Sequence, residues 1–180
     1  MAGKEQRMWD LTKIKTPEAI EEFKKLAQDQ TIDPNYKNQY GEYFLWLAAF
    51  YGQPEMIQAL LENHGKIINI NLAKEKDGTT PLYIACQEGH EGVVKLLLER
   101  NEIDINKPNN NNDTTPLYIA CHNGHESVVK LMLASKHHSK IEIESKSYPK
   151  FDPLLRRYQT NPIKVNQEFR IELGMAGLNY

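Results

Sequence analysis

An internal repeat constrains the fold of this 180-residue chain more than any other feature. Residues 78–101 read GTTPLYIACQEGHEGVVKLLLERN, and residues 113–136 read DTTPLYIACHNGHESVVKLMLASK. Thr80 and Thr115 hold equivalent places 35 residues apart, and residues 43–63 form a weaker third copy. A single unit of this length cannot bury its apolar face alone. The sequence therefore predicts an array of similar units that stack on one another.

Each unit carries the start and stop signals of two short helices. Thr80 is suited to cap the first helix, and Pro81 follows at the first helical position, where its missing N–H costs nothing. Gly89 is expected to end this helix, because a left-handed residue at a helix end is favourable only for glycine. The second helix should begin near Glu91. The alternating run at 103–106 predicts an extended arm between units.

These motifs together are similar to the ankyrin repeat. The matching elements are T-P-L-x-x-A, G-H, V-V-K-L-L-L and I-D-I-N, as they stand within residues 80–106. The histidine that usually follows T-P-L in the family is replaced by Tyr83 and Tyr118, and by Trp46 in the weaker copy. The resemblance implies an all-α solenoid of stacked helix-turn-helix units with β-hairpin-like arms. It implies a single array over residues 1–180, divided into an N-terminal capping repeat at 5–35, repeats at 36–71, 72–106 and 107–146, a degenerate C-terminal cap at 147–174 and a tail at 175–180.

Amphipathic segments near both ends are interpreted as caps, whose outer faces should be polar. The residues expected to point inward from residues 17–27 are Ile20, Phe23 and Ala27. Those expected to point inward from residues 162–174 are Val165, Phe169 and Leu173, with the remaining positions polar.

Composition excludes several classes of protein. Lys and Arg number 22 against 24 Asp and Glu, a net charge of −2, which argues against a nucleic-acid coat. The longest apolar run, residues 44–51, is far shorter than the roughly 20 residues that span a bilayer. The first residues contain no apolar signal-peptide core, and two cysteines fit a reducing compartment. We therefore expect a cytoplasmic monomer without a nucleic-acid or membrane partner.

The reactive side chains have structural interpretations. Cys86 and Cys121 occupy the same repeat position, where the weaker copy has Ala49, so they are predicted to be small buried residues with free thiols. Neighbouring repeats lie about one helix diameter apart, which is too far for a disulfide. His122 and His125 lack partners at a metal-ligand spacing. No phosphate-binding loop, nucleophile elbow or zinc-protease motif occurs. The sequence thus predicts no metal, no cofactor, no catalytic residue and no enzyme.

The ankyrin resemblance implies a non-catalytic scaffold that binds a partner protein on the concave face of the array. In ankyrin binders the contacts come from the arms and the first helices. The arm positions here are Gln39, Tyr40, Glu42, Lys76, Asp77, Thr79, Asn111, Asn112 and Thr114. The first-helix positions are Phe50, Tyr51, Gln87, Glu88, His122 and Asn123.

Two aromatic residues distinguish the first full repeat from the others. Phe50 and Tyr51 align with the polar residues Gln87 and Glu88 of the next repeat. An aromatic side chain at an exposed repeat position is a candidate binding anchor. Partner binding is therefore predicted to centre on the first full repeat.

An alternative is that the chain is the targeting or substrate-recruiting module of a larger enzyme or effector. Ankyrin modules of the T-P-L-Y-I-A-C style are frequent in protists and in proteins that intracellular bacteria deliver into host cells, which would place the chain in the host cytosol. Arg156 and Arg157 replace apolar or small helix residues. They either face solvent or meet a carboxylate or phosphate of a partner.

Overall fold

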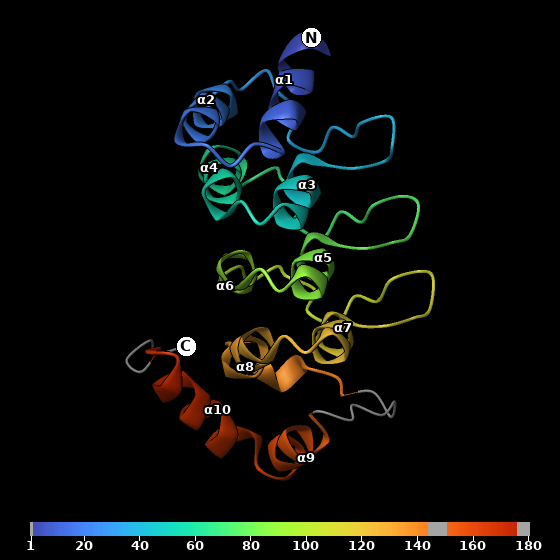
Figure 1. The fold of residues 1–180 in the computed structure, drawn as a ribbon, viewed down its shortest axis with the longest axis vertical. Helices are drawn as coiled ribbons and strands as arrows, with labels where there is room; N and C mark the ends of the chain where they lie inside the picture. Colours follow the sequence, from blue (N-terminus) through green and yellow to red (C-terminus); the bar gives the residue numbers. More distant parts are fainter. Residues whose placement is uncertain (1, 144–150, 176–180) are drawn as a thin grey trace.

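The computed structural model describes residues 2–143 and 151–175, and its helices stack in pairs along one axis (Figure 1). The expected start of the C-terminal cap, residues 147–150, and most of the expected tail, residues 176–180, lie outside the described residues. The pairs are α1 (Ala2–Thr12) with α2 (Pro17–Ala27), α3 (Phe44–Phe50) with α4 (Pro54–His64), α5 (Pro81–Glu88) with α6 (Glu91–Leu98), α7 (Pro116–Asn123) with α8 (Glu126–Ala134), and α9 (Asp152–Thr160) with α10 (Pro162–Glu172), and a 3-10 turn, η1 (His138–Lys140), follows α8.

The two central first helices begin and end where the sequence predicts. Thr80 Oγ1 accepts a hydrogen bond from the Tyr83 amide at 3.0 Å and caps α5, and Thr115 caps α7 in the same way. Gly89 and Gly124 follow these helices with φ of 74° and 81°, in the left-handed region. The repeat motif therefore fixes both the length of the first helix and the turn into the second.

Arms project from the array on the side of α1, α3, α5 and α7 (Figure 1). The first arm closes with an antiparallel bridge between Lys37 and Tyr43. Backbone hydrogen bonds join neighbouring arms, from the Glu75 amide to the Gly41 carbonyl at 3.2 Å and from the Asn110 amide to the Asp77 carbonyl at 2.8 Å. The described residues contain these hairpin-like arms and no regular strand. The arms and first helices therefore lie on the same side of the array, called the arm side below.

An asparagine ladder joins the loops that precede successive arms. Asn35, Asn71 and Asn106 each donate a side-chain hydrogen bond to a carbonyl of the following unit and accept one from an amide of that unit. The carbonyls belong to Ile67, Glu102 and Lys140, and the amides to Asn69, Asp104 and Glu142. Each amide side chain satisfies two backbone groups that the loop cannot pair internally.

Histidines make a second polar link between repeats. His90 Nε2 donates to the carbonyl of Phe50 at 3.0 Å, and His125 Nε2 donates to the carbonyl of Gln87 at 2.9 Å. These carbonyls lie at the C-terminal ends of α3 and α5, where helix geometry leaves acceptors unpaired. The G-H pair of the repeat motif thus supplies a turn residue and a link to the preceding unit.

The N-terminal cap contains one helix more than the sequence analysis anticipated. Phe23 and Ala27 of α2 are fully buried as expected, whereas Ile20 is half-buried. The additional helix, α1, packs on α2 and α3 and buries Met8 and Trp9. No helix in the described part of the chain is long and apolar enough to cross a membrane.

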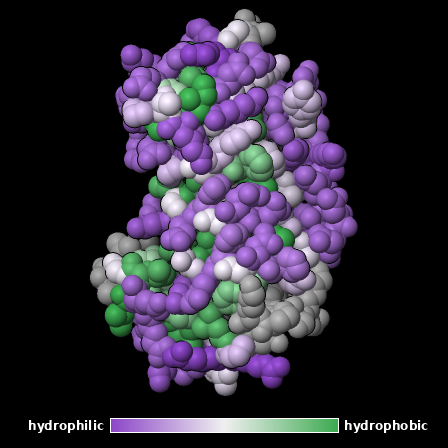
Figure 2. All heavy atoms as spheres, viewed as in Figure 1, coloured by the Kyte–Doolittle hydropathy of each residue, from purple (hydrophilic) through white to green (hydrophobic). Residues whose placement is uncertain are grey.

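The C-terminal cap departs from the polar outer face that was expected. Val165 and Phe169 are buried and Leu173 is half-buried, but Ile163 and Ile171 are 66% and 70% exposed. These two isoleucines lie off the helix face that carries Val165 and Phe169. Figure 2 shows hydrophobic side chains gathered over α10 on an otherwise mostly hydrophilic face.

The two arginines of α9 both face solvent. Arg156 and Arg157 are exposed, and Arg157 forms an ion pair with Glu168 of α10. Arg157 is thus joined to the neighbouring helix, and both side chains are accessible.

Both cysteine thiols are free and buried, so they should be unreactive in the folded protein. Burial raises the pKa of both, that of Cys121 to about 12, and Cys86 Sγ lies 3.7 Å from Met132 Sδ. Ellman's reagent without reductant should therefore label neither thiol at pH 8 and both after denaturation. A denatured mass lower by two hydrogens would reveal a disulfide and contradict this expectation.

Acidification should destabilise the junction between α8 and the C-terminal cap. His137 Nε2 donates to the Arg100 carbonyl at 2.9 Å, and the Tyr158 hydroxyl donates to the His138 carbonyl at 2.6 Å. Burial lowers the pKa of both histidines below the ordinary 6.5, so the folded state favours their neutral forms. Their stabilising contribution is therefore present above pH 6.5 and is lost as the pH falls below it. The melting temperature should drop less between pH 7.5 and 5.5 in His137→Gln/His138→Gln than in the wild type, and equal drops would contradict this assignment.

Candidate functional site

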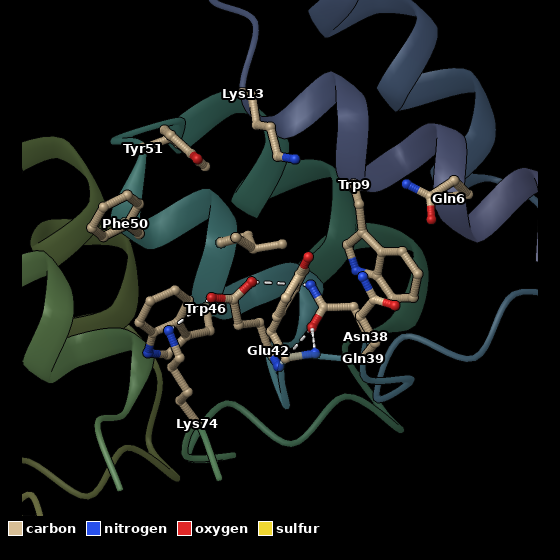
Figure 3. A pocket seen from close by; sticks show the side chains of 12 residues that line it. Gln6, Trp9, Lys13, Asn38, Gln39, Glu42, Trp46, Phe50, Tyr51 and Lys74 are labelled. Atoms are coloured by element: carbon tan, nitrogen blue, oxygen red, sulfur yellow. Dashed lines mark hydrogen bonds and ion pairs between the residues drawn. The ribbon is translucent and has the colours of Figure 1, made fainter. Parts of the chain in front are cut away.

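A pocket of about 440 Å³ lies on the arm side of the array, between the N-terminal cap and the first full repeat (Figure 3). One wall comes from α1, another from α3, and the floor from the first two arms. The residues that line it are Gln6, Trp9, Lys13, Asn38, Gln39, Tyr40, Glu42, Trp46, Leu47, Phe50, Tyr51 and Lys74. A hollow of this size falls within the range of sites that hold ligands or partner side chains.

Aromatic rings from α3 form one wall of the pocket. Phe50 stacks on Trp46 with ring centroids 5.5 Å apart and planes at 6°, and Tyr51 meets Phe50 edge-on at 4.9 Å. The indole Nε1 of Trp46 donates to Thr79 Oγ1 at 3.1 Å, which fixes the ring against the next repeat. Such offset and edge-on pairs contribute packing energy beyond their buried area.

The structure corrects the expectation that Phe50 and Tyr51 occupy exposed positions. Both are half-buried and pack against the hydrophobic core. The reason is the replacement of the usual histidine by Trp46, whose broad indole offers a face on which Phe50 rests. The two rings are therefore part of a preformed wall.

A half-buried ion pair forms the floor of the pocket. Lys74 Nζ lies 2.7 Å from Glu42 Oε1, and each side chain is 16% exposed. The Lys74 ammonium also lies 4.3 Å from the centroid of the Trp46 ring, and Asn38 Nδ2 donates to Glu42 Oε2 at 3.0 Å. The ammonium thus gains a cation–π contact in addition to its carboxylate partner. These contacts join the first arm, the second arm and α3 at one point.

Trp9 of α1 forms the wall opposite the α3 rings. Its indole stacks on Tyr36 at 5.5 Å and meets Phe44 at 5.1 Å, and it is 7% exposed. On the outer surface, Arg7 of α1 donates two hydrogen bonds to Glu22 of α2 at 2.7 and 2.6 Å. Paired hydrogen bonds of this kind orient a helix more firmly than a single contact.

The predicted site residues divide into three groups. Five of them line the pocket, namely Gln39, Tyr40, Glu42, Phe50 and Tyr51, and Tyr40 is 66% exposed. Further along the arm side, the exposed ones are Lys76, Glu88, Asn111, Asn112, His122 and Asn123, while Gln87 and Asp77 are half-buried. The remaining two, Thr79 and Thr114, are buried.

The burial of Thr79 and Thr114 has a common cause. Thr79 Oγ1 accepts from Trp46 and donates to Asp77 Oδ1 at 2.5 Å, and Thr114 Oγ1 lies 2.9 Å from the Tyr83 hydroxyl. Trp46 and Tyr83 hold equivalent positions in successive repeats, and each reaches the threonine at the base of the following arm. The two hydroxyls therefore link repeats and offer little surface to a partner.

Several pocket residues were missed by the sequence analysis, most importantly Trp9, Lys13 and Lys74. Trp9 and Lys13 precede the first recognisable repeat, so self-comparison gives them no counterpart. A single tryptophan among the polar residues of the N-terminal segment was the available signal. In the described residues, no group of three or more His, Cys, Asp or Glu side chains is arranged to hold a metal ion.

Stacked helix pairs with arms on one side define a helical-repeat solenoid. A family model described as ankyrin repeats (3 copies) matches residues 15–109 and 45–147, and the chain therefore belongs to the ankyrin repeat family. Ankyrin repeats are generally protein–protein interaction modules and are typically non-catalytic. No curated protein matches the chain.

Proposed function

We propose that the chain is a non-catalytic module that binds a partner protein on its arm side, with the aromatic pocket as the anchor. The observation that carries the proposal is the preformed α3 wall, in which half-buried rings line a hollow next to the exposed Tyr40. Rigid aromatic groups in partly desolvated pockets commonly dominate binding energy. The polar positions on α5, α7 and the later arms would then form a water-excluding rim.

This proposal includes the finer expectations from the sequence. The capping repeat, three full repeats and C-terminal cap form one array that acts as a monomeric scaffold, in a reducing compartment where both thiols stay free. Neither a nucleic acid nor a membrane is its partner, which fits the net charge of −2. The alternative role, as the recruiting module of a larger enzyme or effector, would use the same surface.

Position-specific cross-linking tests the proposed surface. A photoreactive benzoyl-phenylalanine would replace Tyr40 beside the pocket or, as a matched control, the exposed Gln58 on α4 in the opposite column of helices (Figure 1). In lysate of the native or host cell, the Tyr40 probe should give a discrete cross-linked protein that Phe50→Ala/Tyr51→Ala removes. Cross-linking of that protein from the Gln58 probe instead would place binding on the opposite side.

A further inference from the structure

The two tryptophans of the pocket differ in one respect that points to a ligand. The chain contains only these two, and Trp46 Nε1 is paired with Thr79. Trp9 Nε1 is buried and has no hydrogen-bond partner among the described residues. A buried N–H without an acceptor costs about 1–3 kcal/mol, so a folded chain rarely keeps one without a use. Trp9 lines the pocket and therefore holds an unpaired, desolvated donor at its edge.

A free cation lies beside this donor. Lys13 follows α1 directly, lines the pocket, is exposed and forms no ion pair with another described residue. Figure 3 shows its ammonium group turned toward the space between α1 and α3, on the same side of the pocket as the Trp9 indole. The nearest acid on its own helix turn, Asp10, accepts a hydrogen bond from Gln6. The residue that carries the unpaired N–H and the one that carries the ammonium group thus line the same pocket.

The charged groups that line the pocket leave an excess of one positive charge. Lys74 and Glu42 neutralise each other at 2.7 Å, and Asn38 donates to the same carboxylate. Lys13 is the remaining charged residue of the lining. The pocket therefore complements a group that is negatively charged and accepts hydrogen bonds.

We propose that the pocket binds a segment of a partner protein in which an Asp or Glu side chain lies beside an apolar one. The carboxylate pairs with Lys13 and, once the side chains that cover the indole N–H move aside, accepts a hydrogen bond from Trp9 Nε1, while the apolar side chain packs on Phe50 and Tyr51. This inference rests on the proposed function and names the chemistry of the partner. A protein segment fits better than a small acid because the first-helix positions next to the pocket in the following repeats, Glu88 and His122, are exposed and extend the surface beyond it.

A peptide library gives the first test. Acetylated and amidated heptapeptides with one residue fixed at each position would be probed with the labelled full chain. Binding should select Asp or Glu beside an aliphatic or aromatic residue, and Lys13→Glu should switch the acidic preference to Lys or Arg. Lys66→Glu, at an exposed lysine away from the pocket, is the matched control and should keep the acidic preference.

The indole N–H signals give a direct readout. Trp9→Phe keeps an aromatic ring, removes the donor and assigns the two indole peaks of a ¹H–¹⁵N spectrum. Titration with the best library peptide should shift the Trp9 peak further than the Trp46 peak. Trp9→Phe should weaken binding by about fivefold to tenfold. Because the phenyl ring is smaller than the buried indole, the substitution should also lower the melting temperature. A circular-dichroism spectrum like that of the wild type at the titration temperature would show that the loss of binding is not a loss of fold.

The outcomes separate this inference from the proposed function. Peptides that bind without acidic preference, yet are lost in Phe50→Ala/Tyr51→Ala, would overturn the carboxylate site and leave the protein-binding surface standing. Acidic peptides that bind equally well to that double variant would overturn the role of the aromatic wall. The inference would be overturned if no library peptide bound the chain. It would also be overturned if acetate alone shifted the Trp9 peak with the same affinity as the best peptide.

Discussion

Gly89→Ala should lower the free energy of unfolding by about 2–3 kcal/mol, although it adds only one methyl group. Gly89 has φ of 74°, where a Cβ atom is strained. The new Cβ would also lie 2.5 Å from His125 Nδ1, so the imidazole would have to move. That movement breaks the hydrogen bond from His125 to the Gln87 carbonyl, and the substitution therefore damages a helix end and a repeat junction together. Thermal melts should show a decrease of roughly 5–10 °C.

Gly92→Ala is the matched control, three residues further along the chain. Gly92 is exposed within α6, its φ is not in the left-handed region, and a Cβ there would meet only the Pro54 side chain at 3.6 Å. Alanine should raise stability by about 0.5–1 kcal/mol at such a helical position. Equal melting temperatures for the two variants would show that the turn geometry at Gly89 is wrong.

Phe50→Ala with Tyr51→Ala should weaken binding of the partner protein at least about tenfold, or roughly 1.4 kcal/mol. The double substitution removes the outer part of the α3 wall and leaves Trp46 without its stacked neighbour. Because both rings are half-buried, it should also lower the free energy of unfolding by about 1–3 kcal/mol, less than full burial would imply. The change in affinity can be measured by calorimetry with the purified partner protein that the cross-linking probe at position 40 identifies.

Two controls separate lost contact from lost stability. Leu96→Ala removes a half-buried side chain from α6, away from the pocket, and should destabilise the fold while leaving the affinity unchanged. Gln87→Ala with Glu88→Ala alters the equivalent positions of the next repeat and should reduce affinity by less than the aromatic pair. Normal binding by the Phe50/Tyr51 variant would place the anchor elsewhere.

The repeat motif was sufficient to predict the local geometry of the central units. Thr80 and Gly89 bound α5 because capping and left-handed turns depend on individual residues and not on tertiary context. The pocket was harder to predict, since its lining combines α1, two arms and α3. Lys74 reaches Trp46 from the arm of the following repeat, and that proximity follows from how the units stack.

Thr79 and Phe50 show where alignment between repeats stops being informative. Alignment places Thr79 on an arm, and its hydroxyl is engaged by Trp46 and Asp77 within the chain. Phe50 was assigned to the surface because its counterpart Gln87 is polar, yet the larger ring folds back on Trp46. Alignment identifies the place of a backbone position, whereas the size and polarity of its neighbours decide where the side chain points.

The asparagine ladder makes the array extensible. Asn71 and Asn106 each bind one backbone carbonyl and one backbone amide at equivalent places in the next unit. A second copy of residues 72–106 placed after Asn106 would therefore present that carbonyl and amide to Asn106, and its own last asparagine would bind the unit that follows. Tandem duplication of one coding segment then adds a unit without inventing a new interface. The identity of residues 79–86 and 114–121 is what such an event leaves in a sequence. Copy number, and not redesign of the fold, sets how long an arm-side surface this chain architecture can offer.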